Sequence, residues 1–295
     1  MKNTLTATFL LLLTGISASA QYGNTKQLVE EFGISLNAMN CKTDVEGRIA
    51  DPGNFRPSAG VYAGLLYREL LGLRLEATFG TITATDKKAT KKVFKNRNLS
   101  FKTNITEISL LAEFHPLKLK QAYTPALSFY LLAGVGYFSF NPQASLNNKW
   151  IALQPLHTEG QGFPETDIPN YKLSQINLPL GGGLQYNLSE RFVLRGEAVY
   201  RLLNTDYLDD VSRKYIRPVL FDKYLSPTDA ELAKRLADRS GELTGDVVSK
   251  AGERRGNPQK DAYYSINLKL GIKLDKVGSN ISNRRVRKAI GCYRF

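Results

Sequence analysis

Eight segments of the chain alternate bulky apolar residues with polar or small ones, with a period of two. In the last segment, residues 264–274, Ile266 and Leu268 share one face while Asn267 and Lys269 share the other. Successive side chains of a β-strand point to opposite faces, so the alternation predicts strands with one apolar and one polar face. The eight segments are residues 30–40, 59–68, 73–83, 104–115, 126–140, 174–186, 191–202 and 264–274.

The connections between these segments alternate between short and long. The short ones are residues 69–72, 115–125 and 187–191, and the long ones are residues 41–58, 84–100, 141–173 and 204–261. Short turns at one rim and long loops at the other are typical of outer-membrane barrels, whose strands of about ten residues cross the bilayer at a tilt. The predicted fold is therefore all-β, an eight-stranded antiparallel transmembrane β-barrel with long outer loops.

The polar faces of the strands carry charges of both signs. A soluble eight-stranded barrel also alternates, but its apolar faces point inward. A lumen enclosed by eight strands is only just wide enough for side chains, and paired acids and bases can fill it. We expect the apolar faces to meet lipid and the following charged residues to lie in the lumen: Glu31, Arg74, Glu76, Glu107, Glu113, Arg195, Glu197, Arg201, Lys269 and Lys273.

Residues 1–20 have the features of a secretory signal peptide. Lys2 supplies a positive start, residues 9–16 form a short apolar core, and Ala18-Ser19-Ala20 is a small-residue cleavage site. Downstream, no run of eighteen apolar residues predicts a membrane-spanning helix. We expect a bacterial outer-membrane location, with the barrel in residues 21–275 and a separate tail in residues 276–295.

The tail is strongly basic, within a chain of formal net charge +13. The eighth strand descends from a long outer loop, which places the tail in the periplasm. It can meet an acidic partner or anionic lipid there, or it can be a solvated disordered segment. An exported chain makes nucleic acid an unsuitable partner. The candidate partner-binding residues are Lys276, Arg284, Arg285, Arg287, Lys288 and Arg294.

The two cysteines lie at opposite ends of the predicted topology. Cys41 follows the first, ascending strand, and Cys292 lies beyond the last, descending strand. A membrane thickness separates them in this topology. We therefore predict two unpaired thiols.

The longest loop contains a helix signal at residues 226–240. Ser226 suits the N-cap, Pro227 the first helical position, and Asp229 the first turn. Apolar residues at helical spacing form a narrow stripe of mostly alanines. Such a helix either packs over the mouth of the barrel or docks a partner.

Residues capable of catalysis or metal binding are few. His115 falls at a short turn and His157 in a long loop, so the only two histidines are predicted on opposite sides of the membrane. Asp206, Asp209 and Asp210 offer carboxylates for Ca²⁺, but a solvated acidic turn is the simpler interpretation of their spacing. A Ser-His-Asp arrangement built on His157 is the other alternative. We expect no enzyme and no catalytic, cofactor-binding or metal-binding residues.

Several strings that strand periodicity does not dictate resemble a known family. They are residues 97–114, 130–144, 150–165, 171–192, 205–212 and 255–264, and they include the loop strings LQPLHTEGQG and TDYLDDVS. Together they resemble the PorG-type outer-membrane barrels associated with type IX secretion. The resemblance implies a non-enzymatic barrel that associates at its periplasmic face with a ring built from a lipoprotein and a periplasmic protein. It implies no particular binding residues.

Three functions follow as hypotheses. The first is a structural or accessory barrel of the type IX secretion machinery, embedded in outer-membrane lipid and anchoring periplasmic ring proteins. The second is a surface binding protein or adhesin that uses its long outer loops. The third is a passive pore, which a lumen filled with charged side chains disfavours.

Overall fold

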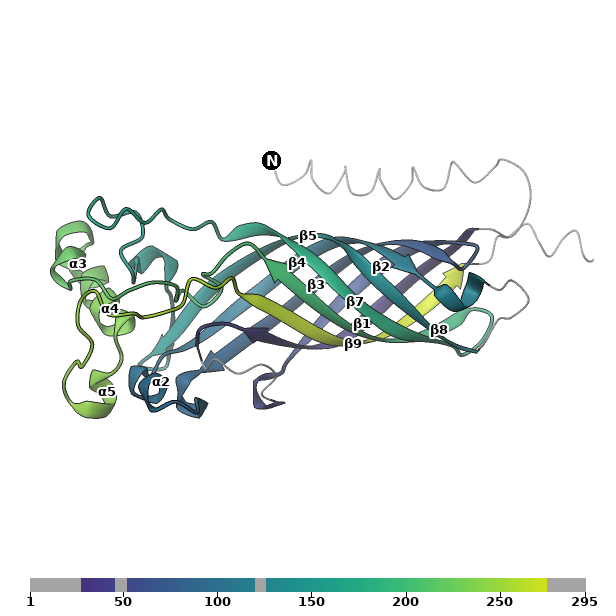
Figure 1. Ribbon diagram of the computed structural model, residues 1–295. Helices are drawn as coiled ribbons and strands as arrows, with labels where there is room; N and C mark the ends of the chain where they lie inside the picture. The colour runs from purple at the N-terminus through teal and green to yellow at the C-terminus, as the bar shows by residue number, and fades with distance from the viewer. Residues whose placement is uncertain (1–27, 46–51, 120–125, 275–295) are drawn as a thin grey trace, which may run out of the picture.

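The computed structural model describes residues 28–45, 52–119 and 126–274. Within these residues one antiparallel sheet has the strand order β4-β3-β2-β1-β9-β8-β7-β5-β6, and a further pairing of β4 with β5 closes a barrel of eight strands (Figure 1). The strands are β1 (Leu28–Lys42), β2 (Arg56–Tyr67), β3 (Leu71–Thr85), β4 (Ser100–Phe114), β5 (Leu127–Leu146), β6 (Lys149–Ala152), β7 (Ser174–Asn187), β8 (Phe192–Leu203) and β9 (Ala262–Leu274).

Each of the eight predicted strands is confirmed as a barrel strand. The alternation did not reveal β6, a four-residue strand that folds back on the outer end of β5. Asn147 and Asn148 both have positive φ, which suits the tight turn between the two strands. The Asn-Asn pair was thus the only sequence signal for this hairpin.

The outward faces of the strands form an apolar belt. On β3, Leu71, Leu73, Leu75 and Phe79 are 43–55% exposed, whereas the next outward residue is Thr81. The eight steps from Leu71 to Phe79, at about 3.4 Å per step and a tilt of about 40°, cover about 21 Å along the membrane normal. This height is close to the apolar band of about 25 Å that outer-membrane barrels present to lipid.

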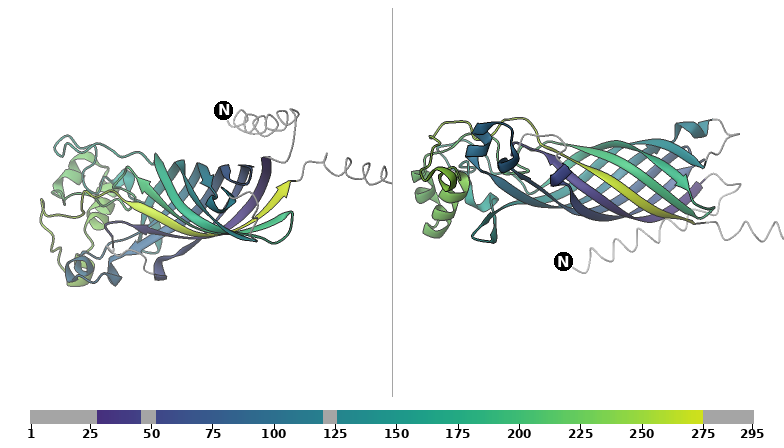
Figure 2. Two further views of the ribbon diagram at one scale, coloured as in Figure 1. Left: turned by 45° about the vertical axis from the view of Figure 1, so that its right-hand side comes forward. Right: turned by 90° about the horizontal axis from the view of Figure 1, so that it is seen from below.

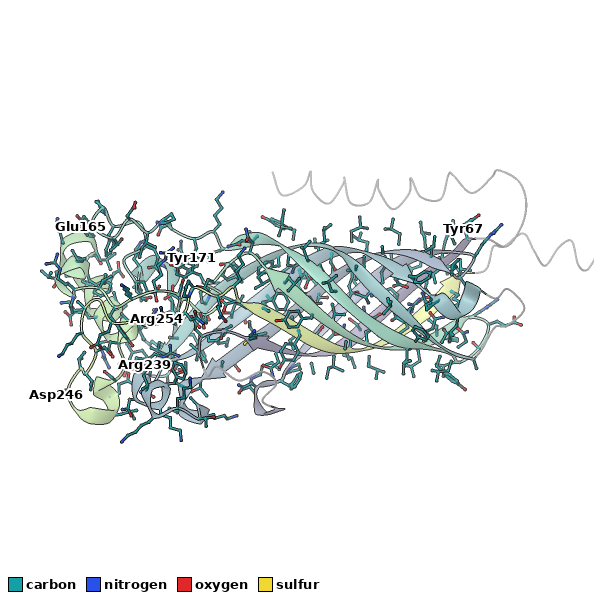
Figure 3. The ribbon with its side chains drawn as sticks, in the orientation of Figure 1. Tyr67, Glu165, Tyr171, Arg239, Asp246 and Arg254 are labelled. Atoms are coloured by element: carbon teal, nitrogen blue, oxygen red, sulfur yellow. The ribbon has the colours of Figure 1, made fainter. Side chains whose placement is uncertain are left out.

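Aromatic side chains border this belt at both ends. Phe79, Tyr137, Tyr200 and Tyr264 lie toward the long loops, and Tyr67, Phe114, Tyr186 and Phe192 lie toward the short turns, where Figure 3 shows Tyr67. Aromatic girdles of this kind occupy the two membrane interfaces of outer-membrane barrels. The belt and its girdles confirm the predicted transmembrane barrel and its outer-membrane location. None of the helices in the described ranges is long and apolar enough to cross a bilayer.

The long loops are folded into a compact cap at one end of the barrel (Figures 1 and 2). We define the cap as residues 43–45, 52–55, 86–99, 147–173 and 204–261. It contains η2 (Pro52–Asn54), η3 (Asp86–Lys88), α2 (Lys92–Arg97), η5 (Gln154–Leu156), α3 (Val219–Tyr224), α4 (Pro227–Ala237) and α5 (Gly241–Thr244), whereas η4 (Pro116–Leu119) lies in a short connection. The start of β1 and the end of β9 lie at the opposite end of the barrel.

The helix predicted at residues 226–240 is confirmed as α4. The Ser226 hydroxyl accepts a hydrogen bond from the Asp229 backbone N–H at 3.2 Å, and Pro227 opens the helix. Its alanine-rich stripe is buried inside the cap together with side chains of α3. The structure therefore supports packing over the barrel mouth as the role of this stripe.

Three predictions fall on residues that the structure does not describe. These are the signal peptide at residues 1–20, the basic tail at residues 276–295 with its six candidate partner-binding side chains, and Cys292. Cys41 is buried where β1 enters the cap. The predicted absence of a bond between the two cysteines stays a prediction.

Candidate functional site

Seven charged side chains from five strands fill the half of the lumen nearer the short turns. We call this group the lumen network, and each member is at most 3% exposed. Its acids and bases come from strands that are distant along the chain but face one another across the lumen. The members are Glu31, Arg74, Glu76, Glu113, Arg195, Glu197 and Lys269.

Arg74 lies at the centre of the lumen network. Its guanidinium donates two hydrogen bonds to the Glu197 carboxylate, at 2.5 and 3.1 Å. It also lies 2.8 Å from a Glu113 oxygen and 3.3 Å from a Glu76 oxygen. Lys269 bridges two of these acids, with Nζ 2.5 Å from Glu76 and 2.9 Å from Glu197. Two cations thus link three carboxylates.

Arg195 extends the lumen network toward β1 and β4. Its guanidinium donates to both oxygens of Glu31, at 2.9 and 2.7 Å, and to Glu113 at 3.0 Å. The Tyr62 hydroxyl donates to Glu31 at 2.7 Å, and the Tyr130 ring lies 5.1 Å from the Arg195 guanidinium. Bidentate pairing and aromatic faces both stabilise a guanidinium that is removed from water.

The lumen network blocks this half of the barrel. The space between Glu31, Tyr62, Arg74, Glu113 and Arg195 has no room for a water molecule. The prediction that charged residues fill the lumen is confirmed for every residue named, and Lys273 at the rim keeps 11% of its side chain exposed. These side chains therefore close the barrel instead of lining an aqueous channel.

Apolar side chains close the half of the barrel nearer the cap. Between the two halves, Arg201 donates to Glu107 at 2.6 Å, and the Tyr263 hydroxyl donates to the same carboxylate at 2.9 Å. Beyond them Phe138 packs against Phe140 and Tyr263, with ring centroids 5.4 and 5.7 Å apart. We call this second seal the apolar plug: Met39, Cys41, Val45, Ile82, Ala84, Leu99, Phe101, Ile105, Phe138, Phe140, Tyr171, Leu203, Leu208, Val211 and Tyr263.

The cap has a hydrophobic core of its own above the apolar plug. Side chains of β5, η5, α3 and α4 meet there, with Phe163 packed between Phe221 and Tyr224. Leu236 and Ala233 are 1% and 0% exposed. A separate core indicates that the loops fold as one unit with a defined outer surface.

Arg97 ties three loops of the cap together. Its guanidinium donates to both oxygens of Asp86, at 2.7 and 2.8 Å. It also donates to the backbone carbonyls of Arg255 at 2.5 Å and Asp44 at 2.8 Å. One buried side chain thus joins the loops that follow β1, β3 and β8.

Arg255 and Glu159 form a second buried connection. Arg255 donates to Glu159 at 3.1 Å, to the Asp210 carbonyl at 2.6 Å and to the Ala237 carbonyl at 3.0 Å. Glu159 also accepts hydrogen bonds from two successive backbone N–H groups, starting at Ser212. The longest loop is therefore held from inside by ion pairing and backbone hydrogen bonds.

The acidic residues 206–210 do not form the solvated turn that the sequence predicts. Asp209 and Asp210 are 1% and 0% exposed. Asp209 accepts hydrogen bonds from the backbone N–H groups of Val45 and Val211, and Asp210 accepts one from the Tyr171 hydroxyl at 2.7 Å. No group of three or more metal-ligating side chains occurs in the described parts of the chain. These carboxylates therefore hold the cap together.

Burial raises the pKa of five carboxyl groups in the cap, those of Asp44, Asp206, Asp209, Asp210 and Asp261. The pKa is about 7 for Asp44, about 8 for Asp206, about 6 for Asp209 and about 7 for Asp210. Removal from water is the largest cause in each case. Repulsion from Asp209 adds to the rise at Asp44 and Asp206, whereas hydrogen bonds to backbone N–H groups oppose it at Asp209.

We expect the cap to be more stable at pH 5 than at pH 8. The folded cap binds more protons than the unfolded chain between about pH 4, the ordinary aspartate pKa, and about pH 8. The free energy of unfolding therefore falls as the pH rises through this window. Trp150, the only tryptophan, lies in the cap, so its fluorescence can follow urea unfolding at each pH. A higher midpoint at pH 8 would contradict the prediction.

A control variant tests whether the carboxyl groups of the cap cause this pH dependence of stability. Asp44→Asn combined with Asp206→Asn removes two of the titrating groups while keeping the side-chain shape. The difference between the two midpoints should shrink in this variant. An unchanged difference would assign the pH dependence to other groups.

The two histidines lie at opposite ends of the barrel, as predicted. His115 follows β4 at the short-turn end, where its Nε2 donates to the Glu113 carboxylate at 3.2 Å and its ring stacks on Tyr130. His157 lies in the cap beside Phe163, and its Nδ1 has no hydrogen-bond partner among the described residues. The structure does not assemble His157 into the Ser-His-Asp arrangement considered from the sequence.

The residues that hold the cap together were not identified from the sequence as a set. Arg97, Glu159 and Arg255 lie in three different loops and have no shared spacing. Their only signal was that strings such as LQPLHTEGQG, which contains Glu159, are not dictated by strand periodicity. They come together only where the loops meet above the barrel, where Arg97 contacts the Arg255 carbonyl and Arg255 contacts Glu159.

Known proteins resemble this chain remotely in structure and not in sequence. The sequence matches no family model and no curated protein. The structure is similar to OprG of Pseudomonas aeruginosa, with 11% identity over 86% of this chain and 99% of that chain and a TM-score of 0.41. It is also similar to a major outer membrane protein of Thermus thermophilus, with 15% identity over 83% and 99% and a TM-score of 0.38.

A third similar structure is Ail, the attachment invasion locus protein of Yersinia pestis, in complex with the heparin analogue sucrose octasulfate. It has 10% identity over 84% of this chain and 98% of that chain, with a TM-score of 0.36. At such low identity and TM-score the assignment rests on the strand pairing, belt and girdles of this chain itself. The chain folds as an eight-stranded antiparallel β-barrel of the outer-membrane type.

Proposed function

We propose that this protein is a non-conducting outer-membrane barrel that binds a partner through its folded cap. The observation that carries the proposal is the double closure of the barrel. The lumen network and the apolar plug fill the two halves of the lumen with side chains, while the long loops form a cap with its own core. In this proposal the protein acts by presenting a surface and not by transporting solutes.

The cap is suited to recognition because its surface is preorganised. Arg97, Arg255 and Glu159 hold the loops in place before any partner arrives. Binding to a surface that is already ordered avoids the entropic cost of ordering loops. Exposed apolar side chains at Leu243, 58% exposed, and Val247, 65% exposed, give the cap contact points of the kind that protein interfaces use.

An accessory role in type IX secretion is the second candidate. The strings that resemble PorG-type barrels contain the cap residues Glu159, Asp209, Asp210 and Arg255, so the resemblance coincides with the architecture of the cap. In this role the barrel anchors a periplasmic ring lipoprotein or protein from its other end. The basic tail is the proposed contact: Lys276, Arg284, Arg285, Arg287, Lys288 and Arg294.

Photo-crosslinking in living cells distinguishes the two candidates. A photoreactive amino acid is placed at Leu243 or Val247 in the cap, or at Leu188 in the short turn after β7, where the side chain is 52% exposed. Cap binding predicts specific protein adducts from the cap positions and none from Leu188. Adducts from Leu188 alone, together with loss of type IX cargo secretion on gene deletion, would support the accessory role instead.

Conductance measurements test the sealed barrel directly. The purified protein should produce no ion channels in planar bilayers, because the space between Glu31, Tyr62, Arg74, Glu113 and Arg195 has no room for a water molecule. A steady single-channel conductance would contradict the proposal for both candidates.

A further inference from the structure

The loop between β3 and β4, residues 86–99, is the most strongly basic segment of the cap. We call it the rim segment. It contains Asp86 as its only acid, and Arg97 neutralises that acid. Its lysines are all exposed to solvent: Lys87, Lys88, Lys91, Lys92 and Lys95. Five exposed positive charges within nine residues create a strong local positive potential.

Two other surface lysines of the cap are paired with acids. Lys223 lies 2.5 Å from Glu165, and Lys234 lies 2.7 Å from Asp222. Such pairs leave little net charge in that part of the surface. The rim segment, in contrast, contains no acid between Lys87 and Leu99. The positive charge of the rim segment is therefore offset within the segment only by Asp86.

The rim segment is held in a fixed conformation. The Asp86 carboxylate accepts two hydrogen bonds from Arg97 and one from the Leu99 backbone N–H at 3.0 Å. The Asp86 N–H in turn donates to the Leu99 carbonyl at 2.9 Å. These hydrogen bonds connect the first residue of the segment to its last residues. The lysines of η3 and α2 are therefore exposed on a loop whose backbone is fixed.

The length of β3 beyond the apolar belt gives the height of the rim segment above the membrane surface. The outward residues of β3 are apolar as far as Phe79 and polar from Thr81 onward. The strand rises by six residues from Phe79 to Thr85, which corresponds to about 16 Å along the membrane normal at a tilt of about 40°. Among the labelled helices, α2 lies nearest to the barrel strands, at the edge of the cap (Figure 1).

This height excludes ordinary phospholipid phosphates as the nearest anions. The polar layer of a phospholipid leaflet is only about 5–8 Å thick. A lysine side chain about 16 Å above the apolar belt instead reaches the larger headgroup of a phosphorylated glycolipid. Val93, 75% exposed between the lysines, adds an apolar contact for the same neighbour.

We propose that the rim segment binds the phosphate groups of glycolipids that surround the barrel in the outer leaflet of the membrane. The site is independent of the partner that the cap binds and depends only on the outer-membrane location of the barrel. Its occupants anchor the cap laterally, so that the outer surface of the cap keeps a constant height above the membrane.

Titration of the purified, full-length protein with a glycolipid tests this proposal. The protein in neutral detergent micelles is titrated with a glycolipid that carries phosphates on an extended oligosaccharide headgroup, and with the same glycolipid after removal of its phosphates. Native mass spectrometry counts the bound molecules. We expect binding of the phosphorylated form that weakens as salt is raised, and little binding of the dephosphorylated form.

Two charge-matched variants complete the experiment. Lys87, Lys91, Lys92 and Lys95 are replaced by Gln in the first, and the exposed residues Lys172, Lys214, Arg217 and Lys250 in the second. The first variant should bind roughly 100-fold more weakly, whereas the second should bind as the unmodified protein does. Heat-modifiable migration confirms that each barrel is folded.

Three outcomes would overturn the proposal. They are equal losses in both variants, undiminished binding by the first variant, and equal binding of the dephosphorylated glycolipid. A fourth is binding of a soluble sulfated polysaccharide without binding of the glycolipid, which would assign the lysines to a different class of ligand.

Discussion

Replacement of Arg74 by methionine should lower the free energy of unfolding of the barrel by about 3–5 kcal/mol. The Arg74 guanidinium contacts Glu76, Glu113 and Glu197, all of which are at most 3% exposed. Methionine fills much of the same volume but leaves these carboxylates with less positive charge nearby. A buried carboxylate without a partner is strongly destabilising because it has lost its hydration.

Urea unfolding in lipid vesicles measures this effect. The loss of heat-modifiable migration on gels reports the barrel, and the midpoint should shift to a lower urea concentration. Lys273→Met provides the control, because Lys273 lies at the rim, 3.8 Å from the partly exposed Glu69. Its effect should be about 1 kcal/mol or less. An Arg74→Met midpoint equal to that of the unmodified protein would show that the lumen network does not stabilise the barrel.

A second variant tests the origin of the Arg74 effect. Glu197→Gln in the Arg74→Met background removes one of the carboxylates that the substitution leaves short of positive charge. The double variant should be more stable than the sum of the two single effects predicts. Simple additivity would mean that the two side chains do not interact.

Replacement of Arg255 by alanine should open the cap while the barrel stays folded. Arg255 is 3% exposed and connects Glu159, the Asp210 carbonyl and the Ala237 carbonyl. Its loss leaves Glu159 without its buried cation, at a cost to the cap of about 3–5 kcal/mol. The eight-stranded barrel does not depend on this contact, because its strands are held by their own pairing.

Limited digestion with chymotrypsin detects the opening. The substitution leaves the number of sites for this protease unchanged, and cleavage should concentrate in residues 204–261. Arg254→Ala is the matched control, since the neighbouring Arg254 side chain is exposed at the surface (Figure 3). Equal digestion of the two variants would show that the buried connection does not hold the cap closed.

The barrel was predictable because the sequence of each strand reflects the two environments of its faces, lipid outside and the lumen inside. Along β9, Ile266 and Leu268 meet lipid while Asn267 and Lys269 meet the lumen, and this pattern repeats with the period of the strand itself. Reading it requires no knowledge of distant residues. The same logic correctly assigned Arg74 and Arg195 to the lumen, although it did not reveal which acids they contact.

The cap was not predictable because its residues act across loops. Asp209 and Asp210 have the composition of a solvated turn or a cation-binding turn, yet the tertiary structure buries both beside Val45, Tyr171 and Arg255. No local period marks such residues, since their partners lie far away along the chain. Only α4 was identified from its own sequence, because capping and helical spacing are local properties.

By itself, the sequence determined the number of barrel strands, which face of each of them meets lipid, and the presence of one capped helix in the longest loop. These features depend on neighbours within a few positions along the chain. Only the tertiary structure decided that the lumen is closed twice and that the loops form a folded cap. Those properties depend on ion pairs between residues that are far apart in the sequence or in different elements, such as Arg74 with Glu197 and Arg97 with Asp86. Each pair forms only in the folded protein, because a buried charge needs a partner of opposite sign.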